Sequence, residues 1–228
     1  AKNKTYIIEA GAKAIQAHYT RLKIDAEVLP LAYGGMYRSK YHLHTHPKVS
    51  VIIPNKDHIE DLQKCICSLE EKNIYDNIEY LIVENNSQKE ETFAYYKKLE
   101  QECLKAKVLY WQGQGFNYPD INNYGVQHAT GEYLLLLNND TEIIKGDCIE
   151  EMLGYCMREE VGIVGARLYY DDGTLQHGGV IVGLGGVAGH AFLGLPMGEP
   201  GYFARALLAQ DLSAVTAACM MVKRSVYE

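Results

Sequence analysis

Residues 49–69 have the sequence VSVIIPNKDHIEDLQKCICSL, in which a short β-branched run directly precedes an amphipathic one. The run 49–53 is typical of a parallel strand that is buried on both faces. Asp57 and Glu60 then form a D-x-x-E helix start, and the apolar residues that follow recur at spacings of four and three. The stretch therefore predicts a strand followed by a helix.

The same unit recurs along the chain. Further strands are predicted over 78–83, 108–111 and 133–137, and further helices over 89–106 and from Pro119 to just before Gly131. Ser87-x-x-Glu90 is expected to be a capping box that starts the first of these helices. Strands separated by helices imply right-handed crossovers and a parallel sheet covered on both faces. The predicted class is α/β, with a doubly wound, mostly parallel sheet.

The chain after residue 147 has less regular patterning. We expect a helix from just after Asp147 to about Arg158, a hairpin around the turn DDGT at 171–174, and a last buried strand over 213–224. Nine glycines lie between 178 and 201, which predicts a long, mobile loop. The sequence stops at Glu228, where another helix should begin, so we expect a domain truncated at its C-terminal end.

Residues 1–46 differ in composition from the rest and are expected to form a small N-terminal annex, with residues 47–228 as the main domain. A helix is predicted from about Glu9 to Leu22, followed by a polar linker that ends in HLHTHP. The alternating histidines of that motif could share one face and bind a metal. Because no carboxylate or thiol of suitable spacing lies nearby in the sequence, a solvated linker is favoured.

The composition limits the classes of function. The chain has 228 residues, of which 47% are hydrophobic and 22% charged, as in a soluble globular protein with one large core. A net charge of −7 leaves no broad cationic face, so nucleic acid is excluded as an expected partner. The six cysteines lack the paired spacing of a zinc site, which indicates reduced thiols. Without a membrane-length apolar run or a signal peptide, the chain is expected to be cytoplasmic.

Polar residues follow three of the predicted strands at the point where each strand ends. They are Pro54-Asn55-Lys56-Asp57, Glu84-Asn85-Asn86-Ser87 and Asn138-Asn139-Asp140. Ligands of an open parallel sheet bind beyond these carboxyl ends, where the strand order reverses. The oxygen-rich cluster after YLLLL suits Mg²⁺ or Mn²⁺, with Asp140 as the candidate ligand. The alternative is that these residues are turn formers that cap the next helix.

Four stretches carry a family resemblance. VSVIIPNKDHIEDLQKCICSL, LIVENNS, FNYPDINNYGVQHATGEYLLLLNNDTE and GARLYYDDGTLQHGGVIVGLGGVAGH resemble glycosyltransferase family 2 in its bacterial cell-surface polysaccharide branch. The match runs in order over about residues 35–228. It implies the GT-A fold of nucleotide-diphospho-sugar transferases.

The resemblance also implies a reaction. A sugar would pass from a nucleotide-diphospho-sugar donor to a glycan or lipid-linked acceptor by a metal-dependent inverting mechanism. A carboxylate would deprotonate the acceptor hydroxyl, and Mn²⁺ or Mg²⁺ would stabilise the departing diphosphate. The location implied is the cytoplasm, at the inner face of the cell membrane if regions outside this chain attach it there.

The resemblance assigns roles to particular residues. Those placed around the donor are Pro54, Asn55, Asp57, Glu84, Asn86, Asn122, Asn123, Asn138 and Asn139. Asp140 takes the metal-ligand position of the family's D-x-D motif, and Asn138 its first, usually acidic, position. Glu84 replaces the family's usual Asp, which would move the carboxylate one methylene deeper. Asn122 stands where many members carry an Arg toward the diphosphate, which weakens the case for tight donor binding.

The acceptor side has fewer candidates. The resemblance implies that the catalytic base usually follows a GGFDE-like segment, after a helix that would begin near Arg224 and therefore beyond Glu228. Asp211 is the nearby acid that could substitute, against the alternative of a cap or surface charge. His177 and His190 could contact the diphosphate or the acceptor, against the alternative of local hydrogen bonding. We therefore expect this chain to bind donor and to be weak or inactive as a transferase.

The sequence leaves a second class of function open and excludes a third. A noncatalytic nucleotide-sugar-binding module of a larger polysaccharide-assembly protein would explain the Asn residues at two usually charged positions. A dinucleotide-dependent oxidoreductase is excluded, because no G-x-G-x-x-G follows the first strand.

Overall fold

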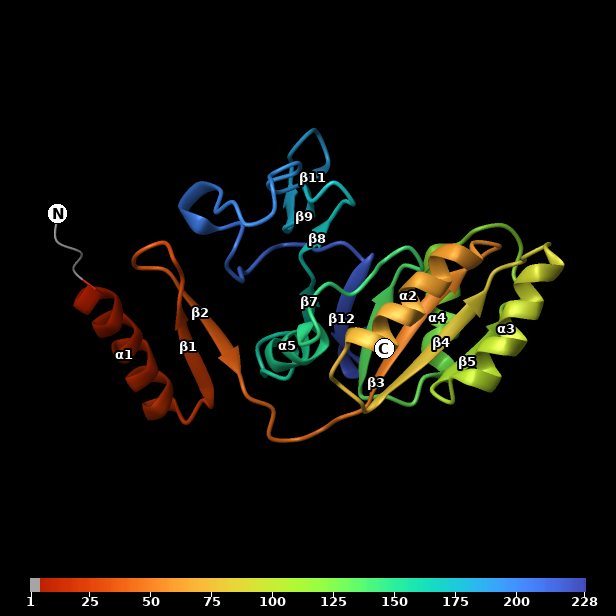
Figure 1. The fold of residues 1–228 in the computed structure, drawn as a ribbon, viewed down its shortest axis with the longest axis horizontal. Helices are drawn as coiled ribbons and strands as arrows, with labels where there is room; N and C mark the ends of the chain where they lie inside the picture. Colours follow the sequence, from red (N-terminus) through yellow and green to blue (C-terminus); the bar gives the residue numbers. More distant parts are fainter. Residues whose placement is uncertain (1–4) are drawn as a thin grey trace. The chain divides into compact units, whose positions relative to one another are not determined.

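The computed structural model describes residues 5–228 and divides into two compact units. The sheet unit comprises Thr45–Gly165 and Thr216–Glu228, and the hairpin unit comprises the residues up to His44 together with Ala166–Val215. Figure 1 labels the helices and strands of both. Each unit is described separately.

The sheet unit contains a six-stranded sheet with the strand order β5-β4-β3-β6-β12-β7. Its strands are β3 (Val49–Asn55), β4 (Ile78–Glu84), β5 (Ala106–Tyr110), β6 (Tyr133–Leu137), β7 (Ile163–Gly165) and β12 (Cys219–Lys223). The first four are parallel to one another, whereas β12 is antiparallel to both β6 and β7. The predicted doubly wound, mostly parallel sheet is confirmed, with an antiparallel edge that the sequence pattern did not reveal.

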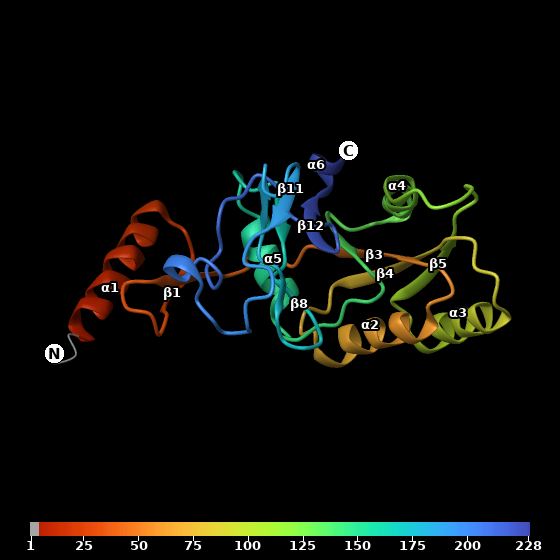
Figure 2. The same cartoon turned by 90° about the horizontal axis from the view of Figure 1, so that it is seen from above.

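Helices cover both faces of this sheet. They are α2 (Ile59–Lys72), α3 (Glu90–Glu102), α4 (Tyr118–His128), α5 (Cys148–Cys156) and α6 (Arg224–Tyr227). Figure 2 shows α2 and α3 on one face and α4 on the other. The reason is the direction of the crossovers. The chain runs from β3 through β4 to β5 at one edge and then returns past β3 to β6. Because crossovers are right-handed, the helix of the return connection, α4, must lie on the face opposite to α2 and α3.

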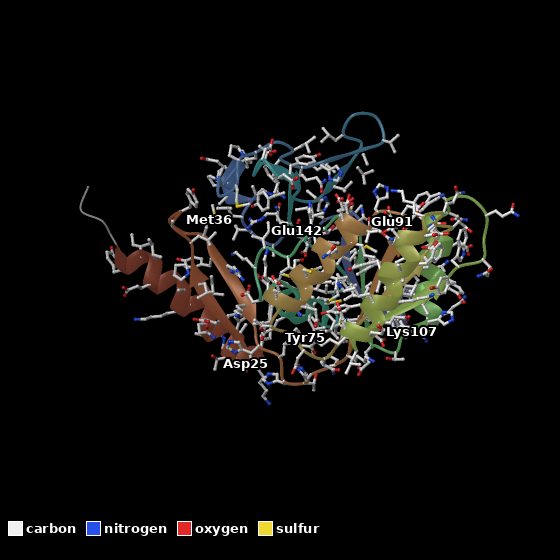
Figure 3. All side chains as sticks on the ribbon, turned by 45° about the vertical axis from the view of Figure 1, so that its right-hand side comes forward. Asp25, Met36, Tyr75, Glu91, Lys107 and Glu142 are labelled. Atoms are coloured by element: carbon white, nitrogen blue, oxygen red, sulfur yellow. The ribbon has the colours of Figure 1, made fainter. Side chains whose placement is uncertain are left out.

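The strand order reverses at β3, which pairs with β4 on one side and β6 on the other. The carboxyl ends of β3 and β6 therefore form the switch point of the sheet, where such folds bind ligands. Figure 3 shows Glu91 and Glu142, which follow β4 and β6, toward one edge of the unit. Tyr75 and Lys107, near the starts of β4 and β5, lie toward the opposite edge.

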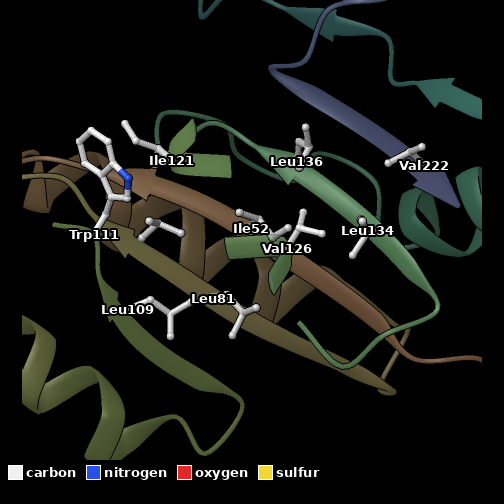
Figure 4. Packing of buried hydrophobic residues seen from close by; sticks show 10 residues of the cluster. Ile52, Leu81, Leu109, Trp111, Ile121, Val126, Leu134, Leu136 and Val222 are labelled. Atoms are coloured by element: carbon white, nitrogen blue, oxygen red, sulfur yellow. The ribbon is translucent and has the colours of Figure 1, made fainter. Parts of the chain in front are cut away.

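The hydrophobic core fills the space between α4 and the sheet (Figure 4). Its buried members are Ile52, Leu81, Val83, Leu109, Trp111, Ile121, Val126, Leu134, Leu136 and Val222. Gly125 lets α4 approach closely, because a Cβ there would lie only 2.5 Å from Ile52 Cγ2. Full burial of an aliphatic side chain of this kind contributes roughly 1.5–3 kcal/mol. The core thereby holds α4 and the strand ends in one rigid arrangement.

The hairpin unit consists of one long helix and several short strands. They are α1 (Thr5–Leu22), β1 (Ala26–Pro30), β2 (Tyr37–Tyr41), β8 (Leu168–Tyr169), β9 (Leu175–His177), β10 (Val180–Val182), β11 (Ala188–His190) and the 3₁₀ turn η1 (Tyr202–Ala204). The strands pair antiparallel as β1 with β2, β8 with β9 and β10 with β11. The predicted helix is confirmed, and so is the hairpin around residues 171–174. None of the helices among residues 5–228 is both long and apolar enough to span a bilayer.

Two expectations for the later part of the chain were wrong. The glycine-rich segment 178–201 is not simply a loop, because β10 and β11 pair within it around a turn of glycines with positive φ. The strand expected over 213–224 begins only at Cys219. Its pairing with β6 runs from Leu137 to Tyr133, and β6 provides no partner for the residues before Cys219.

The amino end of the sheet contains a partly buried ionic cluster around Glu79. Its carboxylate accepts hydrogen bonds from Lys48 Nζ at 2.9 Å, Ser50 Oγ at 2.5 Å and the Thr130 backbone N–H at 2.7 Å. Burial raises the pKa of this carboxyl, but the hydrogen bonds outweigh it and lower the pKa to about 2. The cluster ties β3 and β4 to the turn that precedes β6.

This pKa predicts acid sensitivity. Because the folded-state pKa lies below the ordinary value, the stabilisation is present above pH 4.5 and is lost as the pH falls toward 2. In Glu79→Gln, we expect the free energy of unfolding to be lower by about 2–3 kcal/mol at pH 7 and to fall less steeply between pH 4.5 and 2. Urea titrations at several pH values measure this, with exposed Glu71→Gln as the control. The prediction would be contradicted if the free energy of unfolding fell equally steeply between pH 4.5 and 2 in Glu79→Gln and in the unsubstituted protein.

Candidate donor and metal site

Three strand ends meet at the switch point of the sheet. Asn55 ends β3 and is paired in register with Glu84, which ends β4. Asn138, Asn139 and Asp140 follow β6, which pairs with β3 on its other side. Strand pairing thus brings the sequence-predicted donor residues of three separate segments to one edge.

Asn55 is buried (3% exposed), and its amide bridges two neighbours. The Nδ2 group donates to the Tyr96 hydroxyl at 2.7 Å, and Oδ1 accepts from Asn139 Nδ2 at 2.7 Å. The backbone oxygen accepts from Asn85 N at 2.9 Å. Asn55 therefore connects the loop after β6 with helix α3.

The Glu84 carboxylate is also buried (3% exposed) and engaged with groups of its own unit. It accepts from the Ser87 backbone N–H, from Ser87 Oγ at 2.6 Å and from the Tyr96 hydroxyl at 2.6 Å. Burial, together with the neighbouring Glu84, raises the pKa of Tyr96 well above its usual range. Glu84 thus organises the interior of the site, a role that the sequence did not indicate, and its contact with a base or ribose stays a prediction.

Asp57 has a different structural role from the one predicted. Helix α2 begins after His58 and α3 after Lys89, and neither has a side-chain cap at that residue, so the two predicted capping motifs were wrong. Asp57, with φ of 57°, instead directs its carboxylate to the chain just before α3, where it accepts from the N–H groups of Gln88 and Lys89 at 3.0 Å. These backbone bonds outweigh the effect of burial and lower the pKa of Asp57. Its long-range cap could not be recognised from local spacing.

Removal of this cap has a predictable cost. Asp57→Ala should lower the free energy of unfolding by about 1–2 kcal/mol, because it removes the acceptor of the Gln88 and Lys89 N–H groups just before α3 and places alanine at positive φ. Asp57→Asn keeps an acceptor oxygen and tolerates this backbone conformation, so it should lose less. Chemical denaturation of the three proteins compares them. Equal stability of the alanine and asparagine variants would show that the cap contributes nothing.

The remaining donor candidates flank this edge. Pro54 is half-buried on β3, and Asn86, with φ of 58°, is exposed and donates from Nδ2 to Gly113 O at 3.0 Å. Trp111 Nε1 donates to Asp120 Oδ2 at 3.1 Å and so holds the start of α4 against the end of β5. Pro54, near the end of β3, and Asn86, just after β4, lie at the edge of the sheet where these strands end, which we call the rim.

Asn122 and Asn123 lie on α4 in different environments. Asn122 is buried and donates from Nδ2 to Tyr118 O at 2.8 Å, while its Oδ1 is the one buried side-chain polar atom without a partner among residues 5–228. Asn123 is exposed and accepts from the Tyr227 hydroxyl at 2.8 Å. An unsatisfied buried oxygen costs about 1–3 kcal/mol, so a water or ligand donor at Asn122 would be stabilising.

The Asp140 carboxylate is exposed and takes no hydrogen bond from the part of the chain that the structure describes. The residues before it are fixed, because Asn138 N donates to Ala218 O at 2.9 Å and Asn139 is bonded to Asn55. Burial and the charges of Asp140 and Glu142 raise the pKa of the nearby Cys65 thiol to about 12. A free carboxylate in a region of negative potential suits a hard divalent cation.

The metal ligands present suit Mg²⁺ or Mn²⁺ bound partly by substrate and water, and do not form a site enclosed entirely by protein. Within the described residues, no cluster of three or more His, Cys, Asp or Glu side chains could hold a metal ion. Mg²⁺ is usually bound through one or two carboxylates together with substrate phosphates and water. Asp140 can provide the one carboxylate, so the residues present are compatible with a cation that arrives with its diphosphate.

The predicted acceptor-side residues lie in the hairpin unit. His177 Nδ1 and His190 Nδ1 are 2.9 Å apart, with His177 buried on β9 and His190 exposed on β11. Burial and the neighbouring His190 lower the pKa of His177 to about 4, so His177 is neutral at pH 7. Asp211 is exposed in the same unit. These roles stay predictions.

Comparison with known proteins assigns the chain to a family. The model of glycosyl transferase family 2 matches residues 50–228, which is more than three quarters of the sequence. The chain belongs to glycosyl transferase family 2. As a member, it is a glycosyltransferase domain, and the strand ends described above are those of a GT-A sheet.

Two curated relatives in bacteria share 39% identity with this family 2 chain. One is the uncharacterized protein y4gI of Sinorhizobium fredii (strain NBRC 101917 / NGR234), over 99% of this chain and 25% of that protein. The other is the O-antigen biosynthesis protein RfbC of Myxococcus xanthus, over 96% of this chain and 17% of that protein. The chain spans about a quarter or less of these relatives.

A solved structure has the same fold. The mannosyltransferase PcManGT from Pyrobaculum calidifontis, in complex with GDP-Man and Mn²⁺, superimposes with a TM-score of 0.50 and 18% identity. The match covers 70% of this family 2 chain and 47% of that protein. At this identity the likeness shows the fold alone.

Proposed function

We propose that this chain transfers a sugar from a nucleotide-diphospho-sugar to a glycan or lipid-linked acceptor, with inversion, in the synthesis of a cell-surface polysaccharide. The name of the Myxococcus xanthus relative supports the polysaccharide setting. The mannosyltransferase solved with GDP-Man and Mn²⁺ supports the class of donor and of cation. The observation that carries the proposal is the exposed, unpaired Asp140 carboxylate at the switch point of the sheet. The proposed location is the cytoplasm, at the inner membrane face.

The residues of the sheet unit would hold the donor. The rim formed by Pro54, Asp57 and Asn86 would receive the nucleoside, with Glu84 and Asn55 supporting it from the interior. Asn138 and Asn139 would face the ribose and diphosphate, and Asn122 and Asn123 would approach the diphosphate from α4. A divalent cation held by Asp140 would neutralise the charge that develops on the leaving diphosphate.

Asp211, His177 and His190 are the residues proposed for the acceptor side of the reaction. A carboxylate must take the proton of the attacking hydroxyl, and Asp211 is the proposed base within this chain. His190, the exposed member of the histidine pair, is available for contact with the acceptor or the diphosphate, while His177 supports it from beneath. His177, whose lowered pKa keeps it neutral at pH 7, can donate one hydrogen bond and accept another.

A transfer assay tests the proposal. The chain, with Mn²⁺, is incubated with UDP-, GDP- and dTDP-sugars and oligosaccharide or lipid-linked acceptors, and the product is examined by NMR for anomeric configuration. We expect nucleoside diphosphate release with one donor class, dependent on Mn²⁺, and an inverted linkage. Retention of configuration would contradict the inverting mechanism. Donor binding without release of nucleoside diphosphate would instead favour the noncatalytic nucleotide-sugar-binding module.

A further inference from the structure

The phenol of Tyr96 links the strand ends that form the proposed donor site. Tyr96 lies on α3 and is fully buried, and its hydroxyl accepts from Asn55 Nδ2 at 2.7 Å and donates to Glu84 Oε2 at 2.6 Å. Asn55 Oδ1 accepts in turn from Asn139 Nδ2 at 2.7 Å. We call these side chains the relay. It crosses the ends of β4 and β3 and reaches the loop after β6.

Every donor in the relay is directed toward the Glu84 carboxylate. An ionised carboxylate can only accept, so Tyr96 gives its proton to Glu84 and offers only lone pairs to Asn55. Asn55 must therefore present its NH₂ group to Tyr96 and its oxygen to Asn139. Hydrogen bonds aligned in this way within a low-dielectric interior strengthen one another. The charge of Glu84 thus specifies the orientation of two neutral amides.

The orientation of Asn139 matters because Asp140 follows it in the chain. The relay uses the Asn139 NH₂ group, and its Oδ1 takes no hydrogen bond from any residue that the structure describes. If the Asn55 amide were reversed, its NH₂ group would face that of Asn139, and Asn139 would have to turn as well. Asn139 would then present its NH₂ group, and no longer its Oδ1, next to Asp140. A cation bound there requires oxygen ligands.

We propose that Tyr96 is a positioning residue that acts through Asn55 and Asn139 to hold the loop carrying Asp140 in its cation-binding geometry. The effect on binding rests on the proposed function, whereas the relay itself does not. Partners hydrogen-bonded directly to a metal ligand typically change metal affinity about 10- to 100-fold when they are mutated, and Tyr96, which acts through two further side chains, should have an effect at the lower end of that range. Tyr96 therefore controls donor binding from the interior of the domain.

The test compares two buried tyrosines. Tyr80 on β4 is also fully buried, and its hydroxyl also donates to a carboxylate, Glu70 Oε1, at 2.7 Å. Tyr80→Phe is therefore a matched control outside the relay. We expect Tyr96→Phe to weaken Mn²⁺-dependent binding of UDP or GDP by about tenfold and Tyr80→Phe to leave it unchanged. Adding Asn139→Ala to Tyr96→Phe should cost little more, because both act through one path.

A second readout needs no nucleotide. In the ligand-free protein, Tyr96→Phe should shift the side-chain amide resonances of Asn139 in ¹H–¹⁵N spectra, whereas Tyr80→Phe should not. The relay would be overturned if the Asn139 resonances did not shift, or if the two tyrosine variants lost affinity equally. It would also be overturned if the affinity losses of Tyr96→Phe and Asn139→Ala multiplied in the double variant. If the parent binds neither UDP nor GDP with Mn²⁺, the proposed function fails, and the amide resonances still decide the relay.

Discussion

Asp140→Asn is expected to lower the rate of donor-dependent sugar transfer by about two to three orders of magnitude. The substitution keeps the size of the side chain and removes its charge, so the leaving diphosphate would lose the cation that neutralises it. Because the carboxylate is exposed and makes no hydrogen bond to the described residues, folding should be unaffected. The initial rate of nucleoside diphosphate release with Mn²⁺ measures the effect.

Glu142→Gln is the matched control for this variant. Glu142 is exposed, follows the same strand and acts with Asp140 on the pKa of the Cys65 thiol, so its removal changes the local charge equally. We expect the Glu142→Gln variant to retain most of its activity. Equal losses in the two variants would mean that the general negative potential matters, and that Asp140 has no specific role as a ligand.

Gly131→Ala is expected to give the largest loss of stability. A Cβ at this position would lie 2.6 Å from Lys48 O and 2.7 Å from Ser50 N, both backbone atoms at the start of central strand β3. Gly131 N also donates to Ser50 Oγ at 2.8 Å, and this bond would be displaced. Because backbone in a buried strand cannot move aside cheaply, we expect a loss of about 3 kcal/mol, or roughly 6–12 °C in Tm.

Gly162→Ala provides the comparison within the same unit. A Cβ at Gly162 would meet Val226 Cγ1 at 3.4 Å, which is ordinary van der Waals contact. Its unfolding transition should remain close to that of the parent, as followed by circular dichroism. A Gly131→Ala protein as stable as Gly162→Ala would show that the chain before β6 does not pack as closely on β3 as described.

The sheet could be predicted from the sequence because its strands are long apolar runs between clear helix signals. The runs beginning at Val49, Ile78 and Tyr133 appear as β3, β4 and β6. The hairpin unit could be predicted only in part. Strands of two or three residues, such as β10 and β11, are too short to show periodicity, and β2 has the polar sequence YRSKY.

The position of the site could be predicted, but its internal bonding could not. Asp140 could be located because an acid directly after a buried strand must lie at the sheet edge. The inward bonding of Glu84 and the cap from Asp57 depend on partners brought together by folding, some of them about 30 residues away. Tyr96 shares helical spacing with buried Thr92 and Leu99, which marks an inward face and leaves the partner of its hydroxyl unknown.

The central claim is that the Asp140 carboxylate holds a divalent cation that in turn holds the donor diphosphate. Titration of Mn²⁺ into the chain with UDP or GDP, followed by electron paramagnetic resonance, measures bound cation directly. The parent should bind Mn²⁺ tightly only when nucleotide is present, and Asp140→Ala should weaken that binding at least about tenfold. Equal Mn²⁺ binding by Asp140→Ala and the parent would contradict the claim.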